Sequence, residues 1–357
     1  MLKHTPLHKE HLLLGARMGP FAEWDMPIQY SGIINEHLHT RSKAGLFDIC
    51  HMGEFIIKGE TAAKDVAHLL TCRTDSMYIG RCRYGFMLNE AGGIIDDLII
   101  FKTKENEFML VVNAGTAEKD KEWIRPHLSP NTLFEDTSGK VAKIDLQGPE
   151  SLNILKSYSN ALLEEIKKYH FITGSVCDVK ALISMTGYTG ELGYELYCST
   201  EEAKKIWNKL LENTDVKPIG LGARDTLRLE MGYSLYGQDI DENHTPLEAG
   251  LEKFVYMEKD FIGKEALIKQ KTDGIKNVLV GFVADGRRSP RHDFDALYNN
   301  KPVGKVTSAS FSPCLKKGIG LCYINQNVAA EGVQIKLTDN KVSIEAIVTK
   351  PPFIKKG

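Results

Sequence analysis

Hydrophobic and polar positions recur along the chain with two different periods, which predict a mixed set of helices and strands. Apolar residues return at helical spacing in five segments, namely Thr61–Leu70, Thr116–Arg125, Pro149–Tyr158, Thr200–Leu211 and Gly222–Met231. Strand-like patterns lie between and after them, at Gly93–Lys102, Glu107–Asn113, Val141–Leu146, Val179–Met185, Gly193–Tyr197, Val278–Ala284 and Val333–Thr338. Because these elements follow no regular strand–helix–strand rhythm, they predict an α+β fold rather than a doubly wound parallel sheet.

The last part of the chain predicts a separate, strand-rich domain. The string KTDGIK, Lys271–Lys276, follows a short helix-like segment and marks a boundary. Beyond it, Gly304, Gly318, Gly320 and Gly332 separate short apolar runs. This punctuation is typical of a small β-barrel or jelly roll.

Composition narrows the possible partners. The 45 basic and 47 acidic side chains leave a net charge of -2, which argues against a nucleic-acid partner held by counterion release. No apolar run of about 18 residues occurs, so a membrane partner is not expected. The N-terminal sequence lacks the features of a secretion signal. The 7 cysteines are scattered without CxxC, so we expect reduced, mostly buried thiols in the cytoplasm.

The strand AGGIIDDLIIF, Ala91–Phe101, contains the most informative conflict. Its apolar residues predict burial on both faces, yet Asp96 and Asp97 stand in the middle. Successive side chains of a strand point to opposite faces, so the two carboxylates are not expected to share one site. One acid could face a ligand while the other is tied structurally. Alternatively, both could cap turns or pair with arginines, and the pattern leaves this open.

Glycines and acids also gather in MTGYTGELGYELY, Met185–Tyr197. The spacing matches no phosphate-binding glycine motif, so a ligand-contacting loop and a plain turn between two strands both fit. If Glu195 faces a ligand, its carboxylate would suit the N–C–N edge of a pterin ring.

A third stretch, GLGARDTLRLEMGYSLYGQDID, places Arg224 and Arg228 four residues apart on one helix face. Asp225 lies three residues before Arg228, which predicts a structural ion pair. Arg224 lies near the helix start, where the helix dipole disfavours a cation, so we expect an acidic partner for it.

The histidines and cysteines predict no metal site. His8 and His11 have no HExxH context, and His37 and His39 would point to different helix faces. Neither a GxSxG elbow nor a recognisable nucleophilic cysteine is present. We therefore expect chemistry without a metal.

Nine strings follow one another along almost the whole chain: TPLHKEH, GARMGPFAEWDMPIQY, LFDICHMGEF, NEAGGIIDDLIIF, LVVNAG, LQGPES, TGYTGELGYE, GLGARDTLRLEMGYSLYGQDID and TKPPF. Together they resemble the T protein of the glycine cleavage system. The resemblance implies three domains in a cloverleaf arrangement around a central folate site. The first, with a Greek-key-like sheet and helices, would comprise residues 1–50 and 140–270, a ferredoxin-like second domain 51–139, and the C-terminal barrel or jelly roll 271–357.

The same resemblance implies an aminomethyltransferase of glycine catabolism and one-carbon metabolism. It would take the aminomethyl group from the lipoyl group carried by the H protein, release ammonia and leave 5,10-methylenetetrahydrofolate. Tetrahydrofolate and the H protein are therefore the expected substrate and partner, and the other glycine cleavage components would interact indirectly.

Carried over position by position, the resemblance places the acid at the reactive folate nitrogens on Asp97, the expected catalytic residue. Glu195 matches the pterin-binding residue, and Arg224 matches a basic folate contact. The remaining folate-site positions fall on Met52, Tyr84, Asn113, Tyr188, Tyr236 and Arg291.

Three residues depart from the family's usual pattern. Cys50 stands where a serine is usual, Glu23 where a glycine is usual, and Lys253 where many relatives have tryptophan.

Two other activities on the same fold are alternatives. A folate-dependent demethylase would form methyltetrahydrofolate without ammonia. A folate-binding iron–sulfur assembly factor would centre on KGCYxGQE, whereas this chain has LYGQDIDE without that cysteine. A purely structural interpretation would make Asp97, Glu195 and Arg224 members of core ion pairs.

Overall fold

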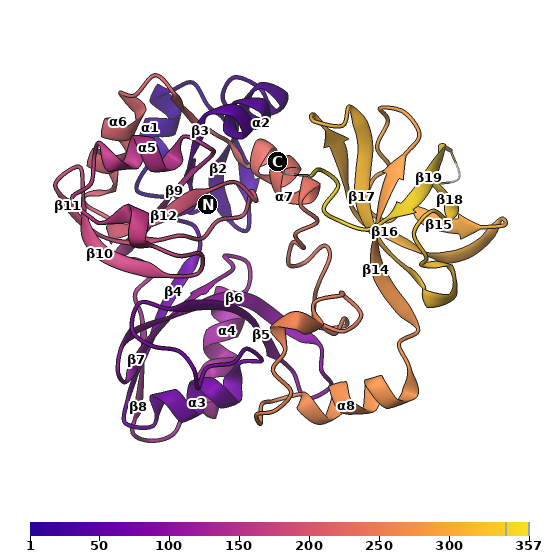
Figure 1. Cartoon of the computed structure of the whole chain (residues 1–357), viewed down its shortest axis with the longest axis horizontal. Helices are drawn as coiled ribbons and strands as arrows, with labels where there is room; N and C mark the ends of the chain where they lie inside the picture. The colour runs from indigo at the N-terminus through magenta and orange to yellow at the C-terminus, as the bar shows by residue number, and fades with distance from the viewer. Residues whose placement is uncertain (340, 356–357) are drawn as a thin grey trace. The chain divides into compact units, whose positions relative to one another are not determined.

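The computed structural model describes residues 1–339 and 341–355. The chain forms two compact units, one made of Met1–Gly85 with Asp97–Arg224 and the other of Phe86–Asp96 with Asp225–Gly357. Helices alternate irregularly with largely antiparallel sheets, so the predicted α+β class is confirmed (Figure 1). The division into three domains stays a prediction.

A six-stranded sheet forms the centre of the first unit. Its strand order is β10-β11-β12-β9-β3-β13, with bounds Phe171–Val176, Val179–Ser184, Gly193–Ser199, Val141–Gln147, Ala44–Asp48 and Val216–Pro218. The neighbours are antiparallel except for β13, which runs parallel to β3. Four α-helices of this unit accompany the sheet: α1 (His8–Leu13), α2 (Ile33–Ser42), α5 (Ser151–Lys156) and α6 (Ala203–Leu211).

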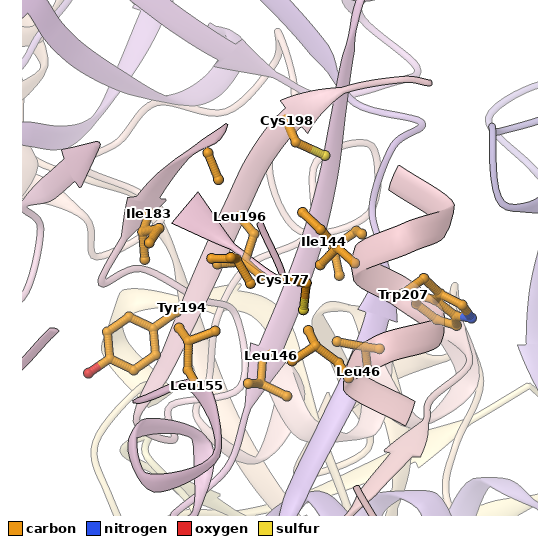
Figure 2. Packing of buried hydrophobic residues seen from close by; sticks show 14 of the residues in the cluster. Leu46, Ile144, Leu146, Leu155, Cys177, Ile183, Tyr194, Leu196, Cys198 and Trp207 are labelled. Atoms are coloured by element: carbon orange, nitrogen blue, oxygen red, sulfur yellow. The ribbon is translucent and has the colours of Figure 1, made fainter. Parts of the chain in front are cut away.

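One face of this sheet is apolar and carries the main core of the unit. Leu46, Ile144 and Leu196 of neighbouring strands belong to one buried cluster with Leu155 of α5 and Trp207 of α6 (Figure 2). All five side chains are fully buried. Burying one large apolar side chain contributes about 1.5–3 kcal/mol, so this face anchors the helices on the sheet. The opposite face is polar and carries Lys143, Asp145 and Glu195.

The five-stranded sheet has the order β5-β6-β7-β4-β8, with bounds Cys82–Leu88, Ile94–Lys104, Glu107–Val112, Gly53–Gly59 and Thr132–Asp136. Helix α3 (Ala62–Leu69) packs on β4, β7 and β8. Helix α4 (Ala117–Ile124) follows β7 and ends in a short 3-10 helix, Arg125–His127. The end of the β5–β6 hairpin, Phe86–Asp96, is grouped with the second unit.

An apolar cluster joins the two sheets of the first unit, and we call it the junction cluster. It contains Cys82, Phe101, Met109, Val111, Phe171 and Tyr197, with Met52 and Ile56 packed against it. Tyr197 comes from the polar face of the six-stranded sheet, whereas Met109 and Val111 come from the five-stranded sheet. The polar face of the six-stranded sheet is therefore covered by the five-stranded sheet and not by solvent.

The second unit contains a closed barrel with the order β14-β17-β16-β15-β18-β19 (Figure 1). The bounds are Asn277–Ala284, Lys317–Asn325, Lys301–Ser312, Asp295–Tyr298, Gln334–Thr338 and Ser343–Thr349. The predicted C-terminal barrel is therefore confirmed. Helix α8 (Lys264–Asp273) precedes it, and short 3-10 helices lie at Glu252–Phe254 and Gln326–Val328. A further 3-10 helix in the first unit spans Leu163–Glu165.

Arg228 is fully buried in the second unit, where it anchors the end of α7 (Leu221–Glu230). Its guanidinium donates to Asp225 at 2.8 Å, to Asp239 at 2.7 Å and to the Ser308 hydroxyl on β16 at 2.8 Å. The ion pair with Asp225 that the sequence predicted is confirmed, and Arg228 is a structural residue.

All five predicted helices and all seven predicted strands are present, with ends that differ by a few residues. The largest shift at a helix start is at α6, which begins at Ala203, and its N-cap residue makes no side-chain capping hydrogen bond. None of the helices in the described part of the chain combines the length and apolar character needed to cross a membrane.

Helices α1 and α2 were not predicted because they bury polar residues and expose apolar ones. In α2, Glu36 is buried, while Ile34 and Leu38 are 46% and 43% exposed. The Glu36 carboxylate accepts hydrogen bonds from the backbone of Tyr30 and Gly32. Such a helix inverts the apolar stripe on which periodicity depends.

The hairpin of β1 (Arg17–Phe21) and β2 (Trp24–Gln29) shows the effect of Glu23. Phe21 pairs with Trp24 across the two-residue turn, and Ala22 and Glu23 have φ values of 45° and 69°. A turn with positive φ at both positions favours glycine or asparagine. The backbone conformation would suit the glycine that the resemblance implies here, and Glu23 adopts a left-handed conformation in its place.

We expect Glu23→Gly to stabilise the first unit by up to about 1 kcal/mol, because glycine adopts positive φ without steric cost. The substitution also removes the 3.2 Å Lys3–Glu23 ion pair, which is exposed and contributes little. Thermal unfolding of the variant would measure the balance. Lys3→Met, which removes the pair and leaves the turn unchanged, is the control. A lower melting temperature for Glu23→Gly than for Lys3→Met would contradict this explanation.

Candidate functional site

The polar face of the six-stranded sheet forms a buried layer of charged residues. Lys143, Asp145 and Gln147 alternate along β9, and Glu195 and Tyr197 alternate along β12. The strand register sets Glu195 opposite Asp145 and Tyr197 opposite Lys143. Each of these five residues is at most 5% exposed. We call these five residues the polar layer.

Two cations balance the two acids of the polar layer. Lys143 Nζ lies 3.4 Å from Glu195 Oε1, and Arg224 Nη1 lies 3.0 Å from Asp145 Oδ2. Glu195 Oε2 also accepts hydrogen bonds from Thr186 Oγ1 at 2.7 Å and from Tyr197 OH at 3.0 Å. The acidic partner expected for Arg224 is therefore Asp145.

The two acids differ in protonation although they lie opposite each other. Burial raises the pKa of Asp145 most, and the Glu195 charge raises it further, to about 7. Burial also acts to raise the pKa of Glu195, but the Lys143 charge and the hydrogen bond from Thr186 outweigh it and lower that pKa. Glu195 is thus the ionised member, and Asp145 titrates near neutral pH.

Aromatic and sulfur groups surround the two cations. The Arg224 guanidinium lies 5.0 Å from the Tyr188 ring centroid and 5.9 Å from that of Phe47. Lys143 Nζ donates to Met52 Sδ at 3.5 Å. Four predicted site residues, Met52, Tyr188, Glu195 and Arg224, are therefore brought together around the polar layer.

Asp97 forms a second constellation with two other predicted site residues. Tyr84 OH donates to Asp97 Oδ2 at 2.9 Å, and Asn113 Nδ2 donates to Oδ1 at 2.9 Å and to the Asp97 carbonyl at 3.0 Å. Burial and the Asp97 charge raise the pKa of Tyr84 well above its usual value, and Tyr188 adds to the effect. Tyr84 therefore keeps its proton and remains a donor to a fixed, half-buried carboxylate.

Asp96 is fully buried, whereas Asp97 is only partly buried. The expectation from strand alternation, that the two acids have different surroundings, is confirmed. Asp97 is the acid that the predicted site residues Tyr84 and Asn113 hold.

The glycine-rich string connects β11 to β12 and continues into β12, a placement that both sequence interpretations allow. Two of its glycines enclose the Gln147 side chain: a Cβ at Gly187 or Gly193 would lie 2.2 Å from its amide. The Gln147 amide donates to Asp145 and to the Thr186 carbonyl, and it accepts from Thr189. These glycines therefore admit a side chain that orients Asp145, and they do not form a phosphate cradle.

Tyr236 and Arg291 belong to the second unit. Tyr236 OH donates to the Ile94 carbonyl at 3.1 Å, and Arg291 is exposed. Lys253 is exposed too, with its ammonium 4.9 Å from the Phe254 ring centroid. Their participation in the site stays a prediction.

Lys143, Asp145, Thr186 and Tyr197 were missed by the sequence interpretation. In VAKIDLQ the charged residues alternate with Ile144 and Leu146, a pattern typical of a strand with one solvated face. That polar face is buried only because the five-stranded sheet covers it, so the local sequence carried no signal of its burial.

One group of possible metal ligands lies away from the polar layer. His4, His8 and Asp25 bring their ligand atoms within 4.8 Å of one another. The His4 and His8 rings stack at 3.7 Å with an interplanar angle of 6°, and His8 Nε2 is already 2.9 Å from Asp25. A metal lies near the plane of each imidazole that binds it, so two parallel stacked rings are poorly arranged to share one ion.

Two family models match the chain. The GCVT N-terminal domain matches residues 7–259, and the glycine cleavage T-protein C-terminal barrel domain matches residues 277–355.

Similar proteins cover the whole length. The aminomethyltransferase of Halothermothrix orenii is 44% identical over 99% of this chain and 100% of its own length. That of Caldanaerobacter subterraneus subsp. tengcongensis is 42% identical over 100% of this chain and 97% of its own. The crystal structure of glycine cleavage system aminomethyltransferase T from Bartonella henselae has a TM-score of 0.94 at 32% identity, covering 99% of this chain and 98% of that one.

The protonation of Asp145 makes stability depend on pH. Its pKa is about 7 in the folded chain against an ordinary value of 3.8, so between these values the folded chain holds a proton that the unfolded chain has lost. The stability that this bound proton adds to the free energy of unfolding is therefore lost as the pH rises from about 4 to about 7. We expect Asp145→Asn, which has no proton to lose, to flatten that part of the stability profile.

Thermal unfolding at several pH values would compare the wild type with Asp145→Asn. Asp215→Asn, which alters a half-exposed acid paired with Lys43, is the control and should keep the wild-type slope. Parallel profiles for the wild type and Asp145→Asn would show that Asp145 is ionised throughout this range.

Proposed function

The chain belongs to the glycine cleavage T-protein family and is an aminomethyltransferase, and we propose that it transfers the aminomethyl carbon from a lipoyl-bearing H protein to tetrahydrofolate. The observation that carries the proposal is the Asp97 carboxylate, whose two oxygens are held by Tyr84 and Asn113. It lies in the same compact unit as the polar layer of Glu195, Asp145 and their cations. A fixed carboxylate in the same unit as an ionised acid suits a nitrogen-rich acceptor.

The polar layer fits a pterin ring in its chemistry. The ring presents neighbouring N–H donors and a carbonyl acceptor, which match the ionised Glu195 carboxylate and the Arg224 guanidinium. Arg224 already lies against the Tyr188 ring, so a flat substrate could share that aromatic surface. The glutamate end of folate carries carboxylates, which arginine binds well, and Arg291 is our candidate for that contact. Tyr236 and Met52 complete the proposed folate contacts.

We assign Asp97 the catalytic role of orienting tetrahydrofolate and accepting a proton from its attacking nitrogen. Both carboxylate oxygens are fixed by neighbours, so the group is positioned before substrate arrives. Positioned general bases contribute about 10²–10⁴-fold to rate, and holding carrier and folate together lowers the entropic barrier further.

The transfer balances without an oxidant or a metal. The aminomethyl carbon loses its bonds to the lipoyl sulfur and to the amine nitrogen and gains two bonds to folate nitrogens. The two protons that leave those folate nitrogens end on the sulfur and on the departing ammonia. The products are the free dihydrolipoyl thiol, ammonia and 5,10-methylenetetrahydrofolate.

The cytoplasm suits this assignment, since the chain has seven free cysteines, six of them buried. Besides tetrahydrofolate, the H protein is the direct partner that we propose, and the remaining glycine cleavage components would meet the chain through it.

Incubation with aminomethyl-loaded H protein and tetrahydrofolate tests the function directly. We expect ammonia and methylenetetrahydrofolate in equal amounts. Methyltetrahydrofolate without ammonia, from a methylated amine or sulfide, would favour the demethylase alternative. Folate binding with neither product would favour the assembly-factor alternative, and no ligand-induced rise in melting temperature would favour a purely structural layer.

For Asp97→Asn we expect kcat to fall about 10²–10⁴-fold, because the amide keeps the shape but cannot accept the proton. Tetrahydrofolate should still raise the melting temperature, which shows that the site remains assembled. Asp215→Asn, on the surface of the same unit, should turn over at the wild-type rate. Wild-type turnover by Asp97→Asn would remove Asp97 from the catalytic role.

A further inference from the structure

Glu54 is an acid for which the proposed reaction has no use. It is 0% exposed, and within the described residues neither Oε1 nor Oε2 has a hydrogen-bond partner. A buried polar group without a partner costs about 1–3 kcal/mol, and a charged one costs more. An unpaired acid in a native interior therefore needs an explanation.

The strand register shows where Glu54 points. Side chains alternate along β4, so Glu54 shares a face with Ile56. Ile56 packs against the junction cluster, and Met52, just before the strand, contacts Lys143. Glu54 therefore faces the space between the two sheets, where Tyr197 and Lys143 lie, and the Lys143 charge acts on it.

Lys143 is held only loosely by its present partners. Its ammonium carries three donors, yet the contacts to Glu195 and to Met52 measure 3.4 Å and 3.5 Å. A charge-assisted N–H···O bond is ordinarily about 2.7–2.9 Å long, and a thioether is a weak acceptor. A cation with weakly used donors thus acts electrostatically on a buried acid with two unused oxygens.

We propose that Glu54 is the alternative acceptor for the Lys143 ammonium, and that it releases a proton when a folate ring engages Glu195. The inference rests on the proposed function, which assigns Glu195 to that ring. The ligand's N–H groups replace Lys143 at the Glu195 carboxylate, and Lys143 turns to Glu54. The O–H bond of the Glu54 carboxyl breaks, its proton goes to solvent, and a Lys143–Glu54 ion pair replaces the Lys143–Glu195 pair. Glu54 is thus a positioning residue that acts through Lys143.

The charged neighbours of Glu54 agree with this exchange. Burial raises the pKa of Glu54 well above its usual value, Lys143 lowers it, and Asp136 and Glu195 raise it. Tyr197 also faces Glu54, and burial keeps that hydroxyl protonated. The acid is therefore neutral while Lys143 pairs with Glu195. Direct contact with Lys143 strengthens its lowering effect on the pKa of Glu54. Ligand binding also occupies the Glu195 carboxylate, whose charge otherwise opposes ionisation of Glu54.

Calorimetric titration of the full chain with tetrahydrofolate, in buffers of different ionisation enthalpy, counts the protons released. We expect about one proton from the wild type near neutral pH, and an affinity that rises with pH by up to about tenfold per unit. Glu54→Gln keeps the shape of the neutral acid but has no proton to lose, so its release should fall toward zero. Glu135→Gln, on the neighbouring strand β8 and half-exposed, is the matched control and should release as many protons as the wild type.

Wild-type binding without proton release, or equal release from Glu54→Gln, would overturn the proposal. Absence of binding would instead remove the proposed function on which it rests. Should Glu54→Gln fail to fold, Glu54→Leu serves in its place. Infrared difference spectra of the wild type are a second measurement: tetrahydrofolate should remove a protonated-carboxyl band, and an unchanged band would also overturn the proposal.

Discussion

The structure of the first unit depends on a sheet whose two faces are both buried but chemically opposite. One face carries Leu46, Ile144 and Leu196 against helices. The other carries Lys143, Asp145 and Glu195 beneath a second sheet. Charges removed from water must be paired and hydrogen-bonded, so elements beyond the two strands supply partners to the polar layer. The β11–β12 connection contributes Thr186, and α7 contributes Arg224.

This constraint also explains why two neighbouring acids behave differently. Two ionised carboxylates at close range repel each other in a medium of low dielectric constant. Lys143, Thr186, Arg224 and Tyr197 together lower the pKa of Glu195. At Asp145, burial and the Glu195 charge outweigh the lowering effects of Arg224, Lys143 and Gln147. One acid ionises and the other holds its proton until about neutral pH. The layer therefore combines a fixed anion with a group that can change its charge at little cost.

Sequence periodicity predicted the elements whose amphipathicity is ordinary, such as α6 with Trp207 inward, and the alternating strands. It failed for α2, which buries Glu36, because local patterns assume that apolar residues face inward. The same assumption concealed Lys143 and Asp145 in a strand that resembles a half-exposed one. Asp97 stood out because it interrupts an apolar run. The local sequence held no sign of partners such as Tyr84, which lies 13 residues away and reaches Asp97 through sheet pairing.

Cys50, at the position where the resemblance implies a serine, makes its contacts beside the polar layer. Its Sγ donates to the Lys143 carbonyl at 3.4 Å and accepts from the Lys143 N–H at 3.3 Å, and its own N–H donates to Asp48. A serine hydroxyl can make the same pair of contacts, so the exchange of oxygen for sulfur keeps the bonding pattern. The thiol can donate only while protonated, and burial together with the Asp48 charge raises its pKa well above the usual value. The environment that holds Asp48 ionised thus keeps Cys50 neutral, and the backbone of Lys143 retains both contacts.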